Sequence, residues 1–477
     1  MRATKGGQHS VMLHLGLGAF HRAHQAAFMQ ELHDGGDENW SLMSGNIRAG
    51  FEETVNALRI QNGRYTLETV TPAGDRAYKC IDSIRVVFPW RADMTEMLSQ
   101  VRDSAVRILS FTVTEAGYYL GPSGRLEMKH PEIVADLTRA REGKPGTTIY
   151  GALAALLRER RRHDGGPITL LCCDNLRHGG GYCRAGLLQF IEEITDLELL
   201  AWVRSNTTSP NAMVDRITPR PTQQLRDRVR AATGVEDAVP VMSEAFRQWV
   251  IEDNFCNGRP AWEKVGVDLV TSVAPYEEAK IRILNAGHSA LAWAGTLVEH
   301  QFIHECVTDT RLATLVRDFV TKDVIPCLSP SPVSLELYSE LVMQRFSNAA
   351  LGDTCQRVAQ DSYSKLRGFI APTICERLHS GSPIESAAVL PALYLEFLER
   401  ATGCGLPWVY EDQSLPSGIV EAVASRSDPV AALCADGNVW GDYAGDFRLC
   451  DAICQARKHL RQLGVCANRD RANSEAN

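Results

Sequence analysis

The sequence has no apolar run near the roughly 20 residues that a membrane-spanning helix needs. It also has no excess of basic residues, with 50 Lys and Arg against 58 Asp and Glu and a net charge of −8. Proteins that bind the phosphate backbone of nucleic acids usually carry a dense basic face. We therefore expect no membrane segment and no nucleic-acid partner.

The 14 cysteines show neither a disulfide framework nor a complete zinc-binding spacing. Cys450 and Cys454 lack a second pair or a nearby histidine, and His21 and His24 also lack partner ligands. We expect no metal site. Residues 1–10 are short and polar, unlike a secretory signal, so we predict free thiols in a reducing compartment, the cytoplasm.

The composition is that of a globular protein, with 44% hydrophobic and 23% charged residues. A length of 477 residues allows two or three domains. The one basic cluster, Arg158 with Arg160, Arg161 and Arg162, is interpreted as the solvated end of a helix, where cations complement the helix dipole.

A Gly-rich turn follows the first apolar run. The apolar run at 11–15 leads into Gly16 and Gly18, and a helical pattern follows at 25–32. Strand, Gly-rich turn and helix begin a dinucleotide-binding fold, in which the backbone approaches a pyrophosphate at a helix N-terminus. However, His21 stands where the third small residue of the G-x-G-x-x-G pattern would be, so an ordinary tight turn remains the alternative.

The next apolar run, at 40–44, ends in Asn46 and Arg48. A fold that prefers NAD often has Asp or Glu here to bind the ribose hydroxyl, whereas Arg48 would suit the 2′-phosphate of NADP. The residues alone leave the choice between NAD and NADP open.

Buried strands and amphipathic helices alternate through the first half of the chain, which predicts a parallel, doubly wound α/β sheet. Glu115 and Asn175 follow two of these strands, so we expect them to face one crevice together with Gly16. The expected elements are a hairpin of 64–70 with 76–87, helices at 93–101 and 148–160, strands at 107–114, 167–175 and 265–273, and a polar link at 211–221.

The pattern from residue 275 onward is helical with few strands. We predict a Rossmann-type NAD-binding domain at 10–273, a mostly α-helical substrate domain at 274–466 and a disordered tail at 467–477. The expected helices of the second domain cover 280–300, 309–325, 335–345, 356–378, 385–401 and 429–433.

The stretch 276–288 carries the chemistry. At roughly 100° per residue, Glu277, Lys280, Asn285 and His288 fall within an arc of about 140° on one helix. A carboxylate, an amine, an amide and an imidazole on one side favour a proton-transfer site over a merely solvated face. Lysine is a poor base at its usual pKa of about 10.4. Burial and a bound, positively charged nicotinamide would lower the pKa of Lys280, whereas a close Glu277 carboxylate would raise it. We therefore expect the Glu277 side chain to point away from Lys280.

Several motifs stand in a fixed order: Gly-x-Gly-Ala-Phe-His-Arg-Ala-His-Gln at 16–25, Thr-Val-Thr-Glu-x-Gly-Tyr at 112–118, Cys-Asp-Asn at 173–175, Met-Val-Asp-Arg-Ile at 213–217, Gln-Trp-Val-Ile-Glu-Asp-Asn-Phe at 248–255, and Lys280-x4-Asn285-x2-His288. With these motifs the chain resembles the mannitol dehydrogenase family, the polyol-specific long-chain dehydrogenases, from about residue 11 to 460. The stretches 45–48, 63–70, 215–221, 275–285 and 292–297 are most similar to the D-arabinitol-oxidising branch.

This resemblance implies oxidation of D-arabinitol to D-xylulose, with D-mannitol to D-fructose as a second reaction, using NAD and no metal, in a monomer whose site lies between its domains. Lys280 would be the general base, Asn175 and Asn285 would bind the reacting oxygen, His288 would position the substrate, and Glu277 would exchange protons with solvent. The residues expected to line the substrate pocket are Asp215, Arg357 and Lys365. The residues expected to bind the cofactor are Gly16, Gly18, Ala19, Phe20, Asn46, Arg48, Thr114 and Glu115.

Four alternatives remain. Tyr276 and Lys280 have the Tyr-x-x-x-Lys spacing of short-chain dehydrogenases, in which the tyrosine is the base. A zinc-dependent polyol dehydrogenase would need ligands that the sequence does not supply. A fructuronate or tagaturonate reductase of the same family would need a cation such as Arg357 or Lys365 for the carboxylate. A non-catalytic NAD-binding protein would need Gly16 and Gly18 but not Lys280.

Overall fold

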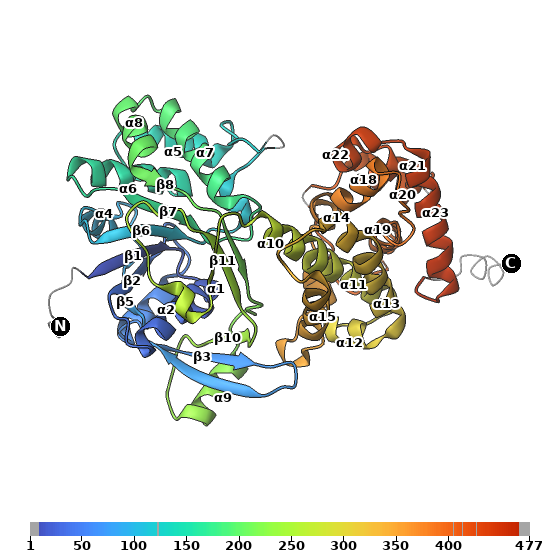
Figure 1. Ribbon diagram of the computed structural model, residues 1–477, viewed down its shortest axis with the longest axis horizontal. Helices are drawn as coiled ribbons and strands as arrows, with labels where there is room; N and C mark the ends of the chain where they lie inside the picture. The colour runs from blue at the N-terminus through green and yellow to red at the C-terminus, as the bar shows by residue number, and fades with distance from the viewer. Residues whose placement is uncertain (1–8, 122–123, 404, 413, 426, 467–477) are drawn as a thin grey trace. The chain divides into compact units, whose positions relative to one another are not determined.

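The computed structural model describes residues 9–121, 124–403, 405–412, 414–425 and 427–466, so the predicted tail at 467–477 lies outside the described residues (Figure 1). Internal contacts divide the chain between Ala274 and Pro275 into two compact units, and the short segment Pro72–Gly74 groups with the second.

A six-stranded parallel sheet forms the centre of the first unit, in the order β5-β2-β1-β6-β7-β8. The strand order reverses beside β1, as it does in the Rossmann fold, so the predicted doubly wound sheet is confirmed. The strands are β1 (Ser10–Leu15), β2 (Trp40–Gly45), β5 (Ile84–Val87), β6 (Val106–Phe111), β7 (Ile168–Cys172) and β8 (Thr207–Thr208).

Helices cover both faces of this sheet because both faces are apolar. Val11, Leu13 and Leu15 of β1 point into one buried cluster and Met12 into another, as the period of a strand requires. The helices of this unit are α1 (Ala19–Ala23), α2 (Gln25–Asp34), α3 (Glu52–Ile60), α4 (Thr95–Val101), η1 (Glu115–Tyr118), α5 (Pro131–Arg141), α6 (Ile149–Arg162), α7 (Gly179–Glu193), α8 (Leu197–Asn206), α9 (Gln223–Thr233) and η2 (Trp262–Val265).

Two small sheets depart from the predicted pattern. The run 76–87 splits, because only its first part pairs in the hairpin while β5 joins the parallel sheet. The polar link at 211–221 contains a strand, and the strand predicted at 265–273 lies in a separate sheet. The alternation of apolar and polar residues identifies a strand, but it does not show which strand it pairs with, and this explains the differences. The sheets are β10-β3-β4 and β12-β11-β9, with β3 (Tyr65–Val70), β4 (Arg76–Ile81), β9 (Ala212–Asp215), β10 (Val241–Glu244), β11 (Gln248–Glu252) and β12 (Asp268–Val270).

The basic cluster at the end of α6 is not simply solvated, so that interpretation is wrong. Arg160 is fully buried. Its guanidinium donates to the carbonyls of Val101 at 2.9 Å, Asp103 at 3.1 Å, Gly166 at 2.7 Å and Pro167 at 3.2 Å. A buried charge is tolerated when its donors are satisfied, and Arg160 here joins the chain segments on either side of it.

The second unit is helical, as predicted. Its elements are α10 (Ala274–Ala279), η3 (Lys280–Asn285), α11 (Ala286–Leu297), α12 (Ile303–Thr308), α13 (Thr310–Phe319), η4 (Val320–Val324), α14 (Ile325–Leu328), α15 (Leu335–Phe346), η5 (Ala349–Leu351), α16 (Cys355–Ala359), α17 (Ser362–Lys365), η6 (Leu366–Ile370), α18 (Ala371–His379), α19 (Val389–Thr402), α20 (Ser417–Ala424), α21 (Pro429–Cys434), α22 (Gly437–Trp440), η7 (Gly441–Tyr443) and α23 (Phe447–Gln462).

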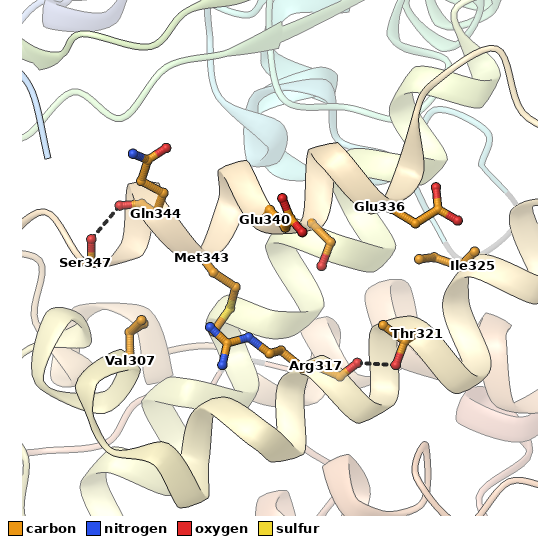
Figure 2. A pocket seen from close by; sticks show the side chains of 10 residues that line it. Val307, Arg317, Thr321, Ile325, Glu336, Glu340, Met343, Gln344 and Ser347 are labelled. Atoms are coloured by element: carbon orange, nitrogen blue, oxygen red, sulfur yellow. Dashed lines mark hydrogen bonds between the residues drawn. The ribbon is translucent and has the colours of Figure 1, made fainter.

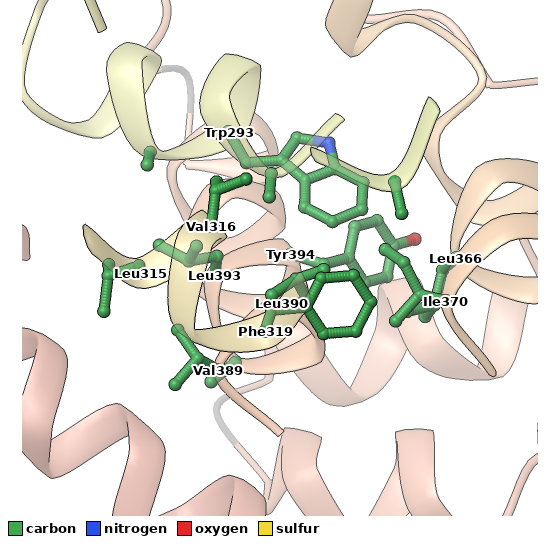
Figure 3. Packing of buried hydrophobic residues seen from close by; sticks show 14 of the residues in the cluster. Trp293, Leu315, Val316, Phe319, Leu366, Ile370, Val389, Leu390, Leu393 and Tyr394 are labelled. Atoms are coloured by element: carbon green, nitrogen blue, oxygen red, sulfur yellow. The ribbon is translucent and has the colours of Figure 1, made fainter. Parts of the chain in front are cut away.

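Helix α11 lies in the core of this unit (Figure 3). Its small residues let neighbouring helices approach on nearly every side, so almost the whole helix is buried. Trp293 packs 5.4 Å from the ring of Tyr394 and donates from Nε1 to Ser362 Oγ at 2.7 Å. The helix that follows the candidate base is thereby held rigidly.

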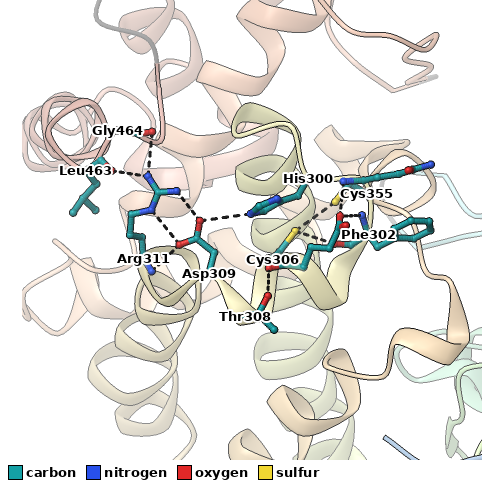
Figure 4. A network of polar contacts seen from close by, with 11 residues as sticks. His300, Phe302, Cys306, Thr308, Asp309, Arg311, Cys355, Leu463 and Gly464 are labelled. Atoms are coloured by element: carbon teal, nitrogen blue, oxygen red, sulfur yellow. Dashed lines mark hydrogen bonds and ion pairs between the residues drawn. The ribbon is translucent and has the colours of Figure 1, made fainter. Parts of the chain in front are cut away.

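Polar contacts fix the loops around α12 and α13 (Figure 4). Asp309 caps α13 and accepts from Arg311, which also donates to the carbonyl of Leu463 at 3.1 Å after α23. These hydrogen bonds to Arg311 keep the pKa of Asp309 low, at about 2, although partial burial opposes the shift. Nearby, Ile303 N donates to Asp353 O at 2.9 Å, which places Asp353 at the end of a short antiparallel bridge.

Candidate active site

The Gly-rich turn has the geometry that its glycines require. Gly16 has a φ of +113°, and a Cβ there would lie 2.1 Å from the carbonyl oxygen of Thr112. Gly18 precedes α1, whose first residues are Ala19 and Phe20, and a Cβ on Gly18 would meet no atom within 4 Å. Thus Gly16 is required by the fold, whereas Gly18 leaves open space at the carboxyl end of β1.

His21, the residue in place of the third small residue, is stacked on His14 of β1. Their ring centroids are 3.5 Å apart with an interplanar angle of 7°. The His14 ring contacts Ser110 at 2.7 Å and Thr112 at 3.1 Å, and His21 contacts Ser44 at 3.1 Å. A hydrogen-bonded imidazole pair therefore joins α1 to three strands, where a Rossmann fold normally uses close packing over a glycine.

Burial makes this histidine cluster sensitive to acid. Burial lowers the pKa values of His21 and His24 to about 3, and it also lowers that of His14. The unfolded chain binds these protons below about pH 6.5 and the folded chain does not, so the free energy of unfolding should decrease as the pH falls from about 6.5 to about 3.

Denaturant unfolding at several pH values checks this prediction. His21→Gln should flatten the pH dependence by up to about 1.4 kcal/mol per pH unit. The matched control is His163→Gln, because the side chain of His163 is 43% exposed. An equal slope in the two variants would contradict the assignment.

The ends of β6 and β7 are clamped together by Asp174. Its carboxylate accepts from Val113 N at 2.8 Å, Thr114 N at 2.9 Å and Tyr118 OH at 2.5 Å. Burial nevertheless raises its pKa. Thr114 has φ +66° and ψ 159°, a conformation normally restricted to glycine. Strain in a β-branched residue, held by a buried carboxyl group, is typical of a functional site.

Asn175 and Glu115, predicted to face one crevice, are in contact. Asn175 Nδ2 donates to Glu115 Oε1 at 2.8 Å. This hydrogen bond orients the amide group of Asn175. Sequence reasoning identified both residues but not their hydrogen bond.

Asn46 and Arg48 lie beyond the end of β2. Asn46 Oδ1 accepts from Leu17 N at 2.7 Å, which ties the Gly-rich turn to β2. Its Nδ2 is buried and has no hydrogen-bond partner among the described residues. Arg48 is bound by Tyr119 and by Glu132, at the start of α5.

The predicted helix at 276–288 is helical throughout, but it is not α-helical throughout. Lys280 to Asn285 form a π-helical segment, η3, between α10 and α11. Bonds between residues five apart place Lys280 and Asn285 across one widened turn, so the arc calculated at 100° per residue does not apply to them. Lys280 and Glu277 are both buried, with 7% and 4% exposure. Insertions of this kind occur frequently at functional sites.

His288 is oriented by partners that the sequence analysis missed. Its Nε2 contacts Asp353 Oδ2 at 3.0 Å, and its ring stacks on Phe346 with a centroid distance of 4.8 Å. Asp353 also accepts from Arg357 Nε at 2.9 Å. Burial opposes ionisation of Asp353, but His288 and Arg357 outweigh it and lower its pKa to about 2. The four-residue spacing of Asp353 and Arg357 was the one feature of the sequence that could have indicated their ion pair.

The remaining predicted pocket residues lie apart from this group along the chain. Lys365 Nζ donates to the carbonyls of Val358 and Gln360, both at 2.6 Å, beyond α16. Asp215 is buried at the end of β9. Their assignment to the substrate pocket stays a prediction.

A separate pocket of about 560 Å³ lies in the second unit between α13 and α15 (Figure 2). Arg317, Glu340 and Met343 line it, and no predicted site residue does. Over the described parts of the chain, no group of three His, Cys, Asp or Glu side chains is placed to bind a metal ion. Every described helix is too short or too polar to cross a bilayer.

The parallel sheet, the strand order and the following helical unit define the class of a two-domain protein with a Rossmann-type nucleotide domain. The mannitol dehydrogenase Rossmann domain model matches residues 10–264, and the mannitol dehydrogenase C-terminal domain model matches residues 272–461. The chain belongs to the mannitol dehydrogenase family, which confirms the resemblance seen in its motifs.

Its relatives align over most of their length. A D-arabinitol 4-dehydrogenase of Ralstonia nicotianae is 51% identical over 452 residues, covering 94% of this chain and 96% of the relative. A D-arabinitol 4-dehydrogenase of Klebsiella pneumoniae is 45% identical, covering 91% and 94%. The structure of Pseudomonas fluorescens mannitol 2-dehydrogenase in a ternary complex with NAD and D-mannitol matches with a TM-score of 0.82 at 33% identity, covering 96% and 92%.

Proposed function

We propose that this protein oxidises a secondary alcohol of a sugar alcohol with NAD, converting D-arabinitol to D-xylulose and, less efficiently, D-mannitol to D-fructose. The observation that carries the proposal is the buried Lys280 in a π-helical turn shared with Asn285. The names of the relatives at 51% and 45% identity support D-arabinitol as the substrate.

The first unit fits a dinucleotide. Gly18 leaves open space beside the start of α1, and the unpartnered Nδ2 of Asn46 is a donor that a nucleotide hydroxyl would satisfy. We propose that the turn at Gly16 and Gly18, with Asn46 and Thr114, holds the cofactor. The bound nicotinamide would accept the hydride.

Side chains of this protein transfer the proton of the substrate hydroxyl and bind the reacting oxygen. In its unprotonated form Lys280 takes the hydroxyl proton, and its ammonium returns a proton in the reverse reaction. Asn285 and Asn175 donate to the reacting oxygen through their side-chain amides without adding charge. Glu115 keeps Asn175 oriented for that role. Glu277 passes protons between Lys280 and solvent.

His288 positions the substrate in this proposal. A proton on Nε2, donated to Asp353, leaves Nδ1 to accept from a polyol hydroxyl. Arg357 is already paired with Asp353, so it is poorly suited to bind the carboxylate of a uronate. This contact favours a neutral polyol over the uronate-reductase alternative.

A substrate panel tests the proposal. D-arabinitol, D-mannitol, D-sorbitol and xylitol are assayed with NAD and NADP, and the ketone D-fructuronate with NADH and NADPH, all after exhaustive chelation, and the substrates are ranked by kcat/KM. D-arabinitol with NAD should lead, and activity should survive chelation. The highest kcat/KM with D-fructuronate would favour the uronate-reductase alternative. Loss of activity on chelation would favour a metal-dependent enzyme. Cofactor binding without turnover of any substrate would favour a non-catalytic protein.

A further inference from the structure

Arg48, the cation expected to bind the 2′-phosphate of NADP, is already paired with the carboxylate of Glu132. Arg48 follows β2, where a Rossmann fold binds the adenine ribose. Its guanidinium forms an ion pair with Glu132 and a hydrogen bond with Tyr119 OH. Its Nε donates to the carbonyl of Thr147 at 3.0 Å. These contacts hold the guanidinium in one position.

The surroundings of Glu132 stabilise its ionised form. It lies in the first turn of α5, where the helix dipole favours negative charge. The hydrogen bond from Tyr119 lowers the pKa of Glu132 most; burial opposes this shift, and Arg48 lowers the pKa further. Burial and the bond to Glu132 raise the pKa of Tyr119 to about 12, so Tyr119 stays protonated and continues to donate.

NAD and NADP differ in charge at the 2′ position of the adenine ribose. The 2′-phosphate of NADP carries about −1.5 to −2 charges near neutrality, whereas the 2′-hydroxyl of NAD carries none. A phosphate that reached Arg48 would meet the carboxylate of Glu132 on the same guanidinium. Either Glu132 must leave Arg48, or two like charges must lie a few ångströms apart.

We infer that Glu132 is a specificity-determining residue, which occupies Arg48 and thereby excludes NADP in favour of NAD. The inference rests on the proposed function, because it requires the ribose to bind at the end of β2. It adds a selecting residue that is far from β2 in the sequence. Arg48 alone would indicate the opposite preference.

The test measures the dissociation constants of NADH and NADPH by nucleotide fluorescence, without turnover. Glu132→Gln keeps the size of the side chain and removes its charge. The ratio of the two constants should shift toward NADPH by about tenfold, as expected for removal of one like charge at a half-exposed position. The double variant Arg48→Ala with Glu132→Gln should lose this gain, because the cation is gone.

Glu142→Gln is the matched control. Glu142 directly follows α5 and pairs with Lys144 at 2.8 Å. Ten residues of helix separate it from Glu132, about 15 Å, which exceeds the Debye length of roughly 10 Å at 0.1 M salt. This variant removes the same charge and should leave the ratio unchanged.

The possible results separate the two proposals. If NADH binds and the ratio is unchanged in Glu132→Gln, or changes equally in Glu142→Gln, the inference about Glu132 is wrong. If neither nucleotide binds to the unmodified protein or to any variant, the proposed cofactor itself is wrong. A gain in NADPH affinity that persists in the double variant would also overturn the inference, because it would not depend on Arg48.

Discussion

Lys280→Ala is expected to slow the oxidation of D-arabinitol by about 10³- to 10⁴-fold while leaving NADH binding nearly intact. The amine is buried in the second unit, whereas the proposed cofactor residues Gly16, Gly18 and Asn46 belong to the first. Removing the base therefore removes the proton acceptor without altering the nucleotide turn. Single-turnover rates and NADH titration measure the two effects separately.

Lys322→Ala is the matched control. Lys322 also lies in a π-helical segment, η4, but its side chain is 60% exposed and pairs with Asp318. This variant should keep its activity. Tyr276→Phe separates the competing assignment, since a short-chain dehydrogenase mechanism requires the tyrosine change to abolish the reaction. Near-normal turnover in Lys280→Ala would rule out Lys280 as the base.

The two glycines of the nucleotide turn should respond oppositely to alanine. Gly16→Ala should destabilise the fold by at least about 1–3 kcal/mol, because its φ is +113° and the new Cβ would lie 2.1 Å from Thr112 O. Gly18→Ala should leave the melting temperature unchanged or slightly raised, since its Cβ meets no atom within 4 Å. Its methyl group should instead weaken NADH binding by about tenfold or more, equivalent to roughly 1.4 kcal/mol.

Thermal unfolding and NADH titration of both variants check this pair, and each variant is the control for the other. A loss of stability in Gly18→Ala would mean that the open space is needed by the protein itself. Tight NADH binding by Gly18→Ala would place the pyrophosphate elsewhere.

The parallel sheet could be predicted because its strands are continuous apolar runs buried on both faces. The helical second unit could be predicted because residues 275–401 repeat the helical period. Helix α23 (Phe447–Gln462) was missed, although its buried Leu449, Ile453, Ala456 and Leu460 recur at helical spacing. The buried role of Arg160 was also missed, because four backbone carbonyls from other segments satisfy it, and a sequence pattern does not show them.

The candidate site was predictable as residue types but not as geometry. The spacing of Lys280 and Asn285 indicated one helical face, yet it did not reveal that the turn is π-helical. Contacts between distant segments were invisible in the same way, as with His288 and Asp353 or Arg48 and Glu132. Each of these pairs depends on how the chain folds back, and local periodicity carries no such information.

Chemical rescue of Lys280→Ala tests the central claim most directly. The variant is assayed with D-arabinitol and NAD, in the presence of a chelator, while small primary amines such as methylamine are added at increasing pH. If Lys280 is the base, the unprotonated amine should restore NADH formation in proportion to its concentration, whereas Tyr276→Phe should be active without any added amine. Absence of rescue in Lys280→Ala, together with rescue or full activity that depends on an added metal ion, would contradict the account.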